Sequence, residues 1–152
     1  METPLWLDEP SPTVDPGTEE RVDVAIIGAG ITLHEAVKAA DTLAEEGINA
    51  RVIDLYSVKP IDKAALQAAA KATHGRIVTV EDHWAEGGIG EAVLSAFADA
   101  DERPDVSIVA VREMPGSGKP MELLAAAGID AEHIIQAVRG LVANARRPAV
   151  AL

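Results

Sequence analysis

Cysteine is absent from this chain of 152 residues, and aromatic side chains make up only 3% of it. Without cysteine there is no disulfide framework, no thiolate metal site and no cysteine nucleophile. Because aromatic residues are so few, Ala, Val, Ile and Leu must fill the core. This favours tight packing of helices on a sheet over a roomy ligand cavity.

Basic residues are scarce as well, since 13 Lys and Arg stand against 25 Asp and Glu and give a formal charge of −12. That charge repels phosphate backbones and anionic membranes. No apolar run approaches the roughly 20 residues of a membrane span, and the start at Met1 lacks the basic and apolar regions of a signal peptide. We therefore expect a cytoplasmic protein that binds neither nucleic acid nor membrane.

The length allows one compact domain with one good core. Residues 1–21 contain four prolines among acidic residues, which predicts a leader or linker. From residue 22 to residue 147, short runs rich in Val and Ile alternate with helical periodicity, and residues 148–152 form a short tail. The alternation is typical of βαβ units and predicts a three-layer α/β/α fold with a mostly parallel sheet.

We expect strands at 22–27, 50–55, 76–80 and 106–111, with helices between them. Thr32 and Glu35 have the spacing of a capping box for the first helix, whose apolar stripe would be Leu33, Val37, Ala40 and Ala44. Asp62 would cap a second helix that extends to Thr73, and residues 88–97 would form a third. Asp130 would cap the last helix, which would end at Pro148.

The turn Gly28-Ala29-Gly30 follows the first strand and precedes a helix, an arrangement that can bind a dinucleotide phosphate. Asp54 lies about where a ribose-binding acid would be, but Leu33 occupies the place of the third glycine. We favour a structural turn. A free-standing Rossmann-like domain that binds a nucleotide or small anion is the first alternative.

A second glycine-rich segment, Gly116-Ser117-Gly118-Lys119, is similar to a phosphate-binding loop. Glu113 stands in place of the first glycine of that motif, and Pro120 in place of the residue that binds magnesium. We expect a turn in which Lys119 is free to meet an anion or a carboxylate across an interface.

The best functional location is the predicted carboxyl edge of the sheet, where Glu81-Asp82-His83-Trp84 precedes Gly87-Gly88-Ile89-Gly90. Neighbouring residues on a strand alternate in direction, which makes a metal site unfavourable, and His83 has no evident nucleophile beside it for acid–base catalysis. His34, His74 and His133 are expected to face solvent or cap helices. We therefore predict no catalytic, cofactor-binding or metal-binding residue in the chain.

Four blocks carry a resemblance over about three-quarters of the chain: VAIIGAGITLHEA (24–36), LYSVKPID (55–62), VEDHWAEGGIGEA (80–92) and GSGKPMELL (116–124). In this order they resemble the C-terminal domain of transketolase, close to the animal-like type. The resemblance implies that the 81–90 block contacts other domains and subunits near the substrate channel. Trp84, expected to be exposed beside it, would be an interface anchor. The candidate residues for an interface or active-site flank are Glu81, Asp82, His83, Trp84, Gly87, Gly88, Ile89, Gly90, Ser117 and Lys119.

For the complete enzyme, the resemblance implies transfer of two-carbon ketol units between sugar phosphates in the pentose phosphate pathway, with thiamine diphosphate and Mg as cofactors. The family holds the cofactor on a Gly-Asp-Gly loop in preceding domains, and no Gly-Asp pair occurs in this chain. We therefore expect the chain alone to be inactive. Its partners would be the thiamine-binding domains, on another chain or on a missing part of this one, within a homo-oligomer such as a dimer.

The chain departs from the family before residue 22, where an extra antiparallel edge strand is usual and this chain has Ser11 to Gly17 with two prolines. Leu5-Trp6-Leu7 is a candidate substitute. Without one, a bare sheet edge favours pairing with another chain. A non-enzymatic interaction module that kept the fold is the second alternative.

Overall fold

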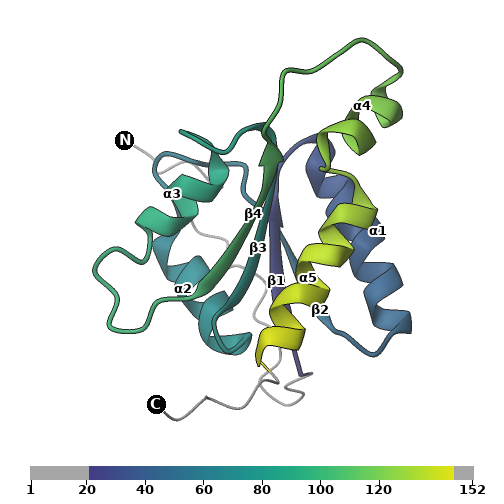
Figure 1. Cartoon of the computed structure of the whole chain (residues 1–152). Coiled ribbons are helices and arrows are strands. Elements are labelled where there is room, and N and C mark those ends of the chain that lie inside the picture. Colours follow the sequence, from purple (N-terminus) through teal and green to yellow (C-terminus); the bar gives the residue numbers. More distant parts are fainter. Residues whose placement is uncertain (1–20, 146–152) are drawn as a thin grey trace, which may run out of the picture.

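A computed structural model describes residues 21–145 of the chain (Figure 1). The predicted tail, the leader up to residue 20 and the candidate strand at Leu5-Trp6-Leu7 lie outside the described residues. None of the helices between residues 21 and 145 is long and apolar enough to cross a membrane.

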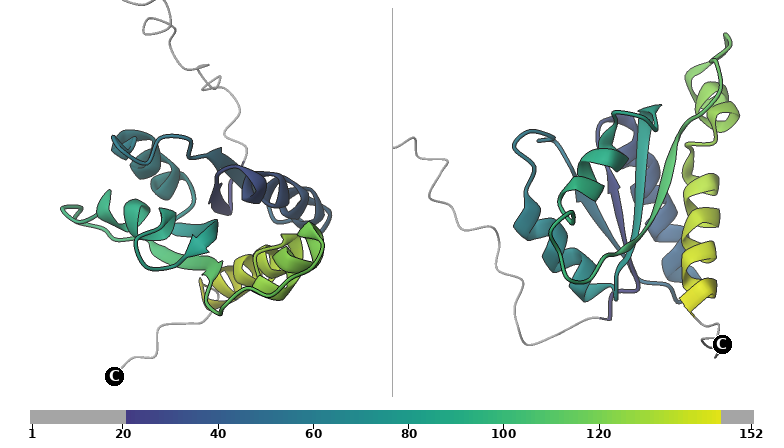
Figure 2. Two further views of the ribbon diagram at one scale, coloured as in Figure 1. Left: turned by 90° about the horizontal axis from the view of Figure 1, so that it is seen from above. Right: turned by 60° about the vertical axis from the view of Figure 1, so that its left-hand side comes forward.

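The described sheet has four strands in the order β2-β1-β3-β4, namely β1 (Val24–Gly28), β2 (Ala50–Asp54), β3 (Arg76–Trp84) and β4 (Asp105–Val111). All three strand pairings are parallel. Helices α1 (Ile31–Glu45) and α5 (Ala131–Ala145) cover one face, and α2 (Lys63–Ala72) and α3 (Ile89–Ser95) cover the other (Figures 1 and 2). The predicted three-layer α/β/α fold is confirmed.

The core divides into two apolar layers, because side chains alternate along each strand. Val24 and Ile26 of β1 join the layer beneath α1 and α5, while Ala25 and Ile27 join the layer beneath α2 and α3. Every residue of β1 is buried, as the nearly continuous Val and Ile content of this segment predicts.

The start of α1 differs from the prediction. Its N-cap is Gly30, with φ 61°, and no side chain caps the helix. The Thr32 hydroxyl instead lies 2.9 Å from two carbonyl oxygens that can accept its one hydrogen, those of Ala29 and Val80. The Glu35 carboxylate accepts from the backbone N–H of Ala131 at 3.0 Å. The predicted capping box is therefore wrong, because both side chains have partners elsewhere in the fold.

The predicted apolar stripe of α1 is also wrong, by one residue. The apolar residues that this helix buries are Ala36, Ala39 and Leu43, whereas Val37 is 46% exposed. The helix is rotated because Thr32 and Glu35 are buried with their hydrogen-bond partners, which carries the neighbouring Leu33 and Val37 away from the core.

A fifth helix, α4 (Pro120–Ala127), was not predicted and stands at the carboxyl end of the sheet (Figure 1). Pro120 opens it, Glu122 accepts from the backbone N–H of Lys119 at 3.0 Å, and Gly128 ends it with φ 71°. Proline at the first position and glycine after the last are helix signals, so the sequence did contain this helix. The predicted caps of α2 and α5 are confirmed, because Asp62 accepts from Ala65 and Asp130 accepts from His133.

Candidate functional site

Glu81, the first residue of the predicted block, is buried at the carboxyl edge with 1% exposure. Its carboxylate accepts from the backbone N–H groups of Ile89, at 2.5 Å, and Gly90, at 3.0 Å, which open α3. A Cβ on Gly88 would lie 1.8 Å from the nearer Glu81 oxygen, so glycine is required beside this carboxylate. Gly90 is buried beside Glu81. Through these two hydrogen bonds Glu81 fixes the loop that precedes α3.

Asp82, His83 and Trp84 lie on the surface, as expected for a contact block. Trp84 is 41% exposed, and Nδ1 of His83 lies 2.7 Å from its backbone oxygen. The pairing of β3 with β4 is irregular between Val80 and Trp84, and such bulges re-aim side chains at sheet edges. Gly87, also exposed, donates its backbone N–H to Glu91 at 2.8 Å.

The turn that contains Ser117 and Lys119 follows β4 at the same edge, because parallel strands end together (Figure 1). Both residues are exposed, and Met114 beside them is 84% exposed. The fold thus brings the two predicted contact segments to one edge of the sheet.

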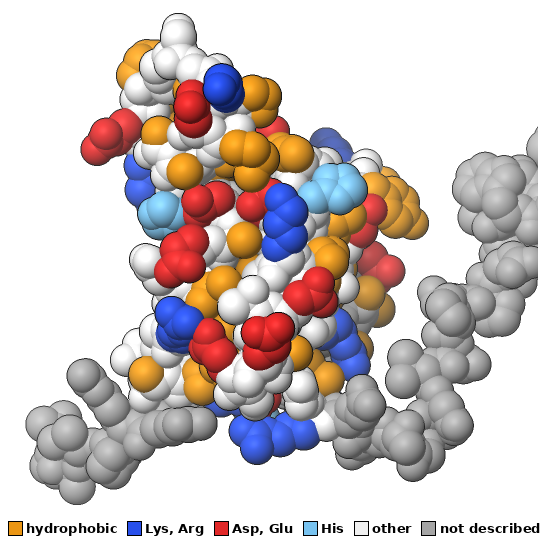
Figure 3. Space-filling model, turned by 90° about the vertical axis from the view of Figure 1, so that its right-hand side faces the viewer, with side chains coloured by type: hydrophobic (Ala, Val, Ile, Leu, Met, Phe, Trp, Pro, Cys, Tyr) orange, Lys and Arg blue, Asp and Glu red, His pale blue; other side chains and the backbone are white. Residues whose placement is uncertain are grey.

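Exposed apolar side chains gather at this edge. Apart from Val37 and Leu94, the large exposed apolar residues among the described ones lie at or beyond the carboxyl ends of the strands or on α4. These residues are Ile31, Tyr56, Val58, Trp84, Met114 and Met121. Figure 3 shows charged side chains of both signs over the α1 and α5 face and apolar ones gathered toward the end that carries α4. An apolar surface to which the chain contributes at the end of all four strands is typical of a docking site.

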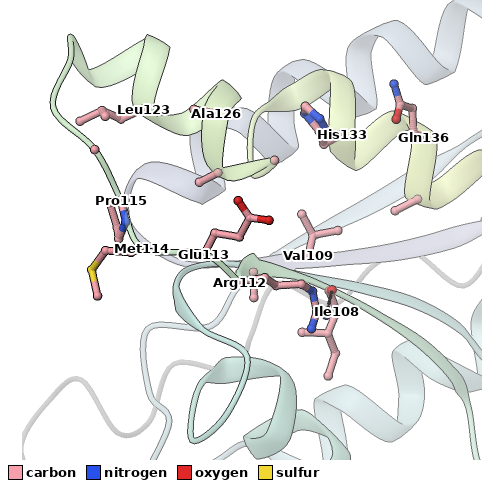
Figure 4. A pocket seen from close by; sticks show the side chains of 15 residues that line it. Ile108, Val109, Arg112, Glu113, Met114, Pro115, Leu123, Ala126, His133 and Gln136 are labelled. Atoms are coloured by element: carbon pink, nitrogen blue, oxygen red, sulfur yellow. Dashed lines mark hydrogen bonds between the residues drawn. The ribbon is translucent and has the colours of Figure 1, made fainter.

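A groove of about 760 Å³ lies between β4, the 112–116 turn, α4 and α5 (Figure 4). The carboxylate of Glu113 extends into it, whereas Arg112 donates to the backbone oxygen of Ile108 at 3.1 Å. His133 is bonded to Asp130 at 2.5 Å. Burial raises the pKa of Asp130, but the hydrogen bonds from His133 outweigh it and lower that pKa from its ordinary 3.8. The polar groups of the groove include no paired nucleophile and base.

At the glycine turn of residues 28–30, backbone N–H groups are bonded to other groups of the protein. The Thr32 hydroxyl accepts from the backbone N–H of Ala29 at 3.3 Å, and Leu33 donates its N–H to the Gly30 oxygen at 3.2 Å. Two of the N–H groups that a phosphate would use are therefore engaged. Asp54 is exposed at the end of β2, where it pairs in register with Gly28. The turn is a structural one, and nucleotide binding is not favoured.

Among residues 21–145 no group of three His, Asp or Glu side chains is placed to hold a metal ion.

The comparisons with known proteins agree with this geometry. Residues 17–134 match the family model of the transketolase C-terminal domain. The chain is 54% identical to transketolase-like protein 2 of Mus musculus over 121 residues, which is 78% of this chain and 19% of that protein. It is 52% identical to the transketolase of Homo sapiens over 124 residues, 80% of this chain and 19% of that one.

A solved structure described as a split gene transketolase, inactive beta4 tetramer, superposes with a TM-score of 0.75 at 38% identity. The match covers 82% of this chain and 40% of that one. The chain thus spans about a fifth of the length of its curated relatives, and the part it spans is their C-terminal domain. The chain belongs to the transketolase family, as a C-terminal domain.

Proposed function

We propose that this chain supplies the C-terminal part of a transketolase whose thiamine-binding domains lie on other polypeptide segments, and that it is inactive alone. The main support is the length of the match, since the chain corresponds to 19% of the human enzyme. The other four-fifths of such an enzyme would contain the cofactor site, because the resembled family holds thiamine diphosphate on the domains that precede this one.

The chain would dock on those domains through the carboxyl edge, where Trp84 and Met114 are exposed. Burial of apolar side chains drives such association, and a central tryptophan is a usual anchor. Once docked, the 81–90 loop and the 112–120 turn would form the outer wall of the active-site funnel. Thiamine diphosphate with Mg, bound by the partner domains, would supply the chemistry that moves two-carbon ketol units between sugar phosphates.

The structure described as an inactive tetramer matches 82% of this chain. We propose that this chain, when separated from its thiamine-binding partner, likewise forms a homo-oligomer without activity.

Reconstitution tests the proposal. The full chain is mixed with a polypeptide that carries the thiamine-binding domains of its own transketolase, and ketol transfer from xylulose phosphate to ribose phosphate is measured. We expect activity in the mixture and none with the chain alone. Activity of the chain alone, or no gain over the partner alone, would refute it.

Variants locate the docking surface. Trp84→Asp with Met114→Asp places two carboxylates in the proposed interface, which is costly unless they are neutralised. We expect loss of reconstituted activity, whereas Leu94→Asp, which changes a side chain of 43% exposure on α3, should keep it. Ile89 is unsuitable for this test because it packs against the layer beneath α2 and α3. Equal loss in both variants would remove this edge from the docking site.

A further inference from the structure

A second long surface that no described residue covers is the outer side of β2. This strand is at the end of the sheet order, and it has no buried residue, although its neighbour β1 is buried throughout. Its outer backbone groups have no strand partner among the described residues. An uncovered edge of this kind is a template for another strand.

The helix above β2 presents an apolar flank on the same side. Helix α5 lies along the opposite flank of α1, because Glu35 bonds Ala131 and Glu46 pairs with Arg139 at 2.5 Å. At 100° per residue, Leu33, Val37, Ala40 and Ala44 turn away from α5 and toward the β2 edge. None of the four is buried. This flank and the outer edge of β2 together are called the β2 surface below.

An occupant of the β2 surface must supply a strand for the edge and apolar side chains for the flank. A second copy of the same surface, related by a two-fold axis, supplies both, because β2 would meet β2 in antiparallel orientation and α1 would meet α1. Such an isologous contact would join two four-stranded sheets into one.

Complementary polar side chains support a second copy as the occupant, because an imidazole can donate a hydrogen bond to a carboxylate. His34 and Asp41 are exposed and border the apolar flank on its solvent side, seven residues apart. Residue 38 is near the midpoint both of the flank, which runs from residue 33 to residue 44, and of the pair at 34 and 41. Antiparallel packing of two α1 helices would therefore place His34 of each copy against Asp41 of the other. We propose that the β2 surface is an interface with a second copy of this chain, distinct from the docking edge.

Sedimentation velocity of the full chain over a range of concentrations tests the interface. We expect Val37→Asp to weaken dimerisation by at least about tenfold, because it buries a carboxylate at the centre of the flank. Leu94→Asp is the matched control, since Leu94 has 43% exposure against 46% for Val37 and lies on the other helical layer. It should leave dimerisation unchanged.

A charge exchange gives a second measurement. His34→Glu places like charges against Asp41 twice per dimer and should weaken it, while His34→Glu combined with Asp41→Lys should restore it. Circular dichroism checks that each variant keeps its helices. A fold-preserving Val37→Asp that associates like the parent, equal weakening by Leu94→Asp, or no restoration by the exchange would overturn the proposal.

The remaining outcomes identify other occupants. A monomeric parent chain that dimerises only after removal of residues 1–20 would assign the surface to that segment and overturn the proposal. If Trp84→Asp with Met114→Asp abolished all association, the contact between copies would be assigned to the carboxyl edge, and the proposal would be overturned. Reconstituted ketol transfer does not depend on the β2 surface, so failure here leaves the proposed function intact.

Discussion

At the residue scale, the carboxylate of Glu81 caps the N-terminus of a helix although Glu81 itself lies on a strand. Glu81 on β3 accepts both backbone N–H groups that open α3. Glu81→Ala would leave one buried and one partly buried donor without an acceptor, so the free energy of unfolding should fall by about 3 kcal/mol. Urea denaturation measures the change. Asp82→Ala, on the exposed neighbour, should change it little, and a similar loss in both variants would contradict the assigned role.

Asp23 makes the free energy of unfolding depend on pH. Burial raises the pKa of this carboxyl group, but hydrogen bonds from the Asn49 backbone and from Arg21 outweigh it, so the pKa falls below its ordinary 3.8. A lowered pKa means that the charged form stabilises the fold above pH 3.8 and that this contribution disappears as the pH falls through the folded-state value.

Asp23→Asn should therefore lower the free energy of unfolding by about 1 kcal/mol at pH 7. The difference from the parent should shrink as the pH falls below 3.8. Urea denaturation at several pH values checks this. A difference that stays constant down to pH 3 would show that the carboxylate charge is not the cause.

At the element scale, the predictable features were those that depend on local patterns. The four strands were located because their short runs rich in Val and Ile are typical of a parallel sheet. The caps at Asp62 and Asp130 were located because their bonds are local. The rotation of α1 was not predictable from spacing, since the burial of Glu35 depends on Ala131, 96 residues away. Helix α4 was missed although Pro120 and Gly128 signal its ends.

Two glycines in helical surroundings should respond in opposite directions to alanine. Gly140 lies inside α5 with open space around the position of a Cβ, so Gly140→Ala should raise the free energy of unfolding by about 0.5–1 kcal/mol. Gly128 has φ 71° and ends α4, so Gly128→Ala should lower it by about 1 kcal/mol. Thermal or urea denaturation compares them. A change of the same sign in both would contradict these backbone assignments.

At the scale of the whole molecule, the position of the candidate surface could be predicted from the sequence, but the side chains that form it could not. All parallel strands end at one edge, so the position of the 81–90 and 112–120 segments followed from strand order alone. Which side chains point outward did not follow, because the irregular pairing near Trp84 and the acceptors of Ile89 and Gly90 are properties of the folded sheet. Glu81 therefore resembled a surface residue in the sequence.

The structural role of the glycine turn predicts that nucleotides do not stabilise the folded chain. Its N–H groups at Ala29 and Leu33 already have partners. A ligand present at 100 times its dissociation constant would add about 2.7 kcal/mol, which is easily detected as a higher melting temperature. NAD, NADP and ATP at millimolar concentration should leave the melting temperature unchanged. A clear rise with any of them would favour the nucleotide-binding alternative.

The two buried glutamates also determine which amides stay protected from solvent. The first N–H groups of a helix usually exchange their hydrogens quickly, because they have no intrahelical acceptor. Here Ile89 and Gly90 donate to Glu81, and Ala131 donates to Glu35. These three amides should exchange about as slowly as those of the central strands in hydrogen-exchange measurements. Since Glu35 joins α1 to α5 across 96 residues, the start of α5 should open only together with α1, as one cooperative unit of the molecule.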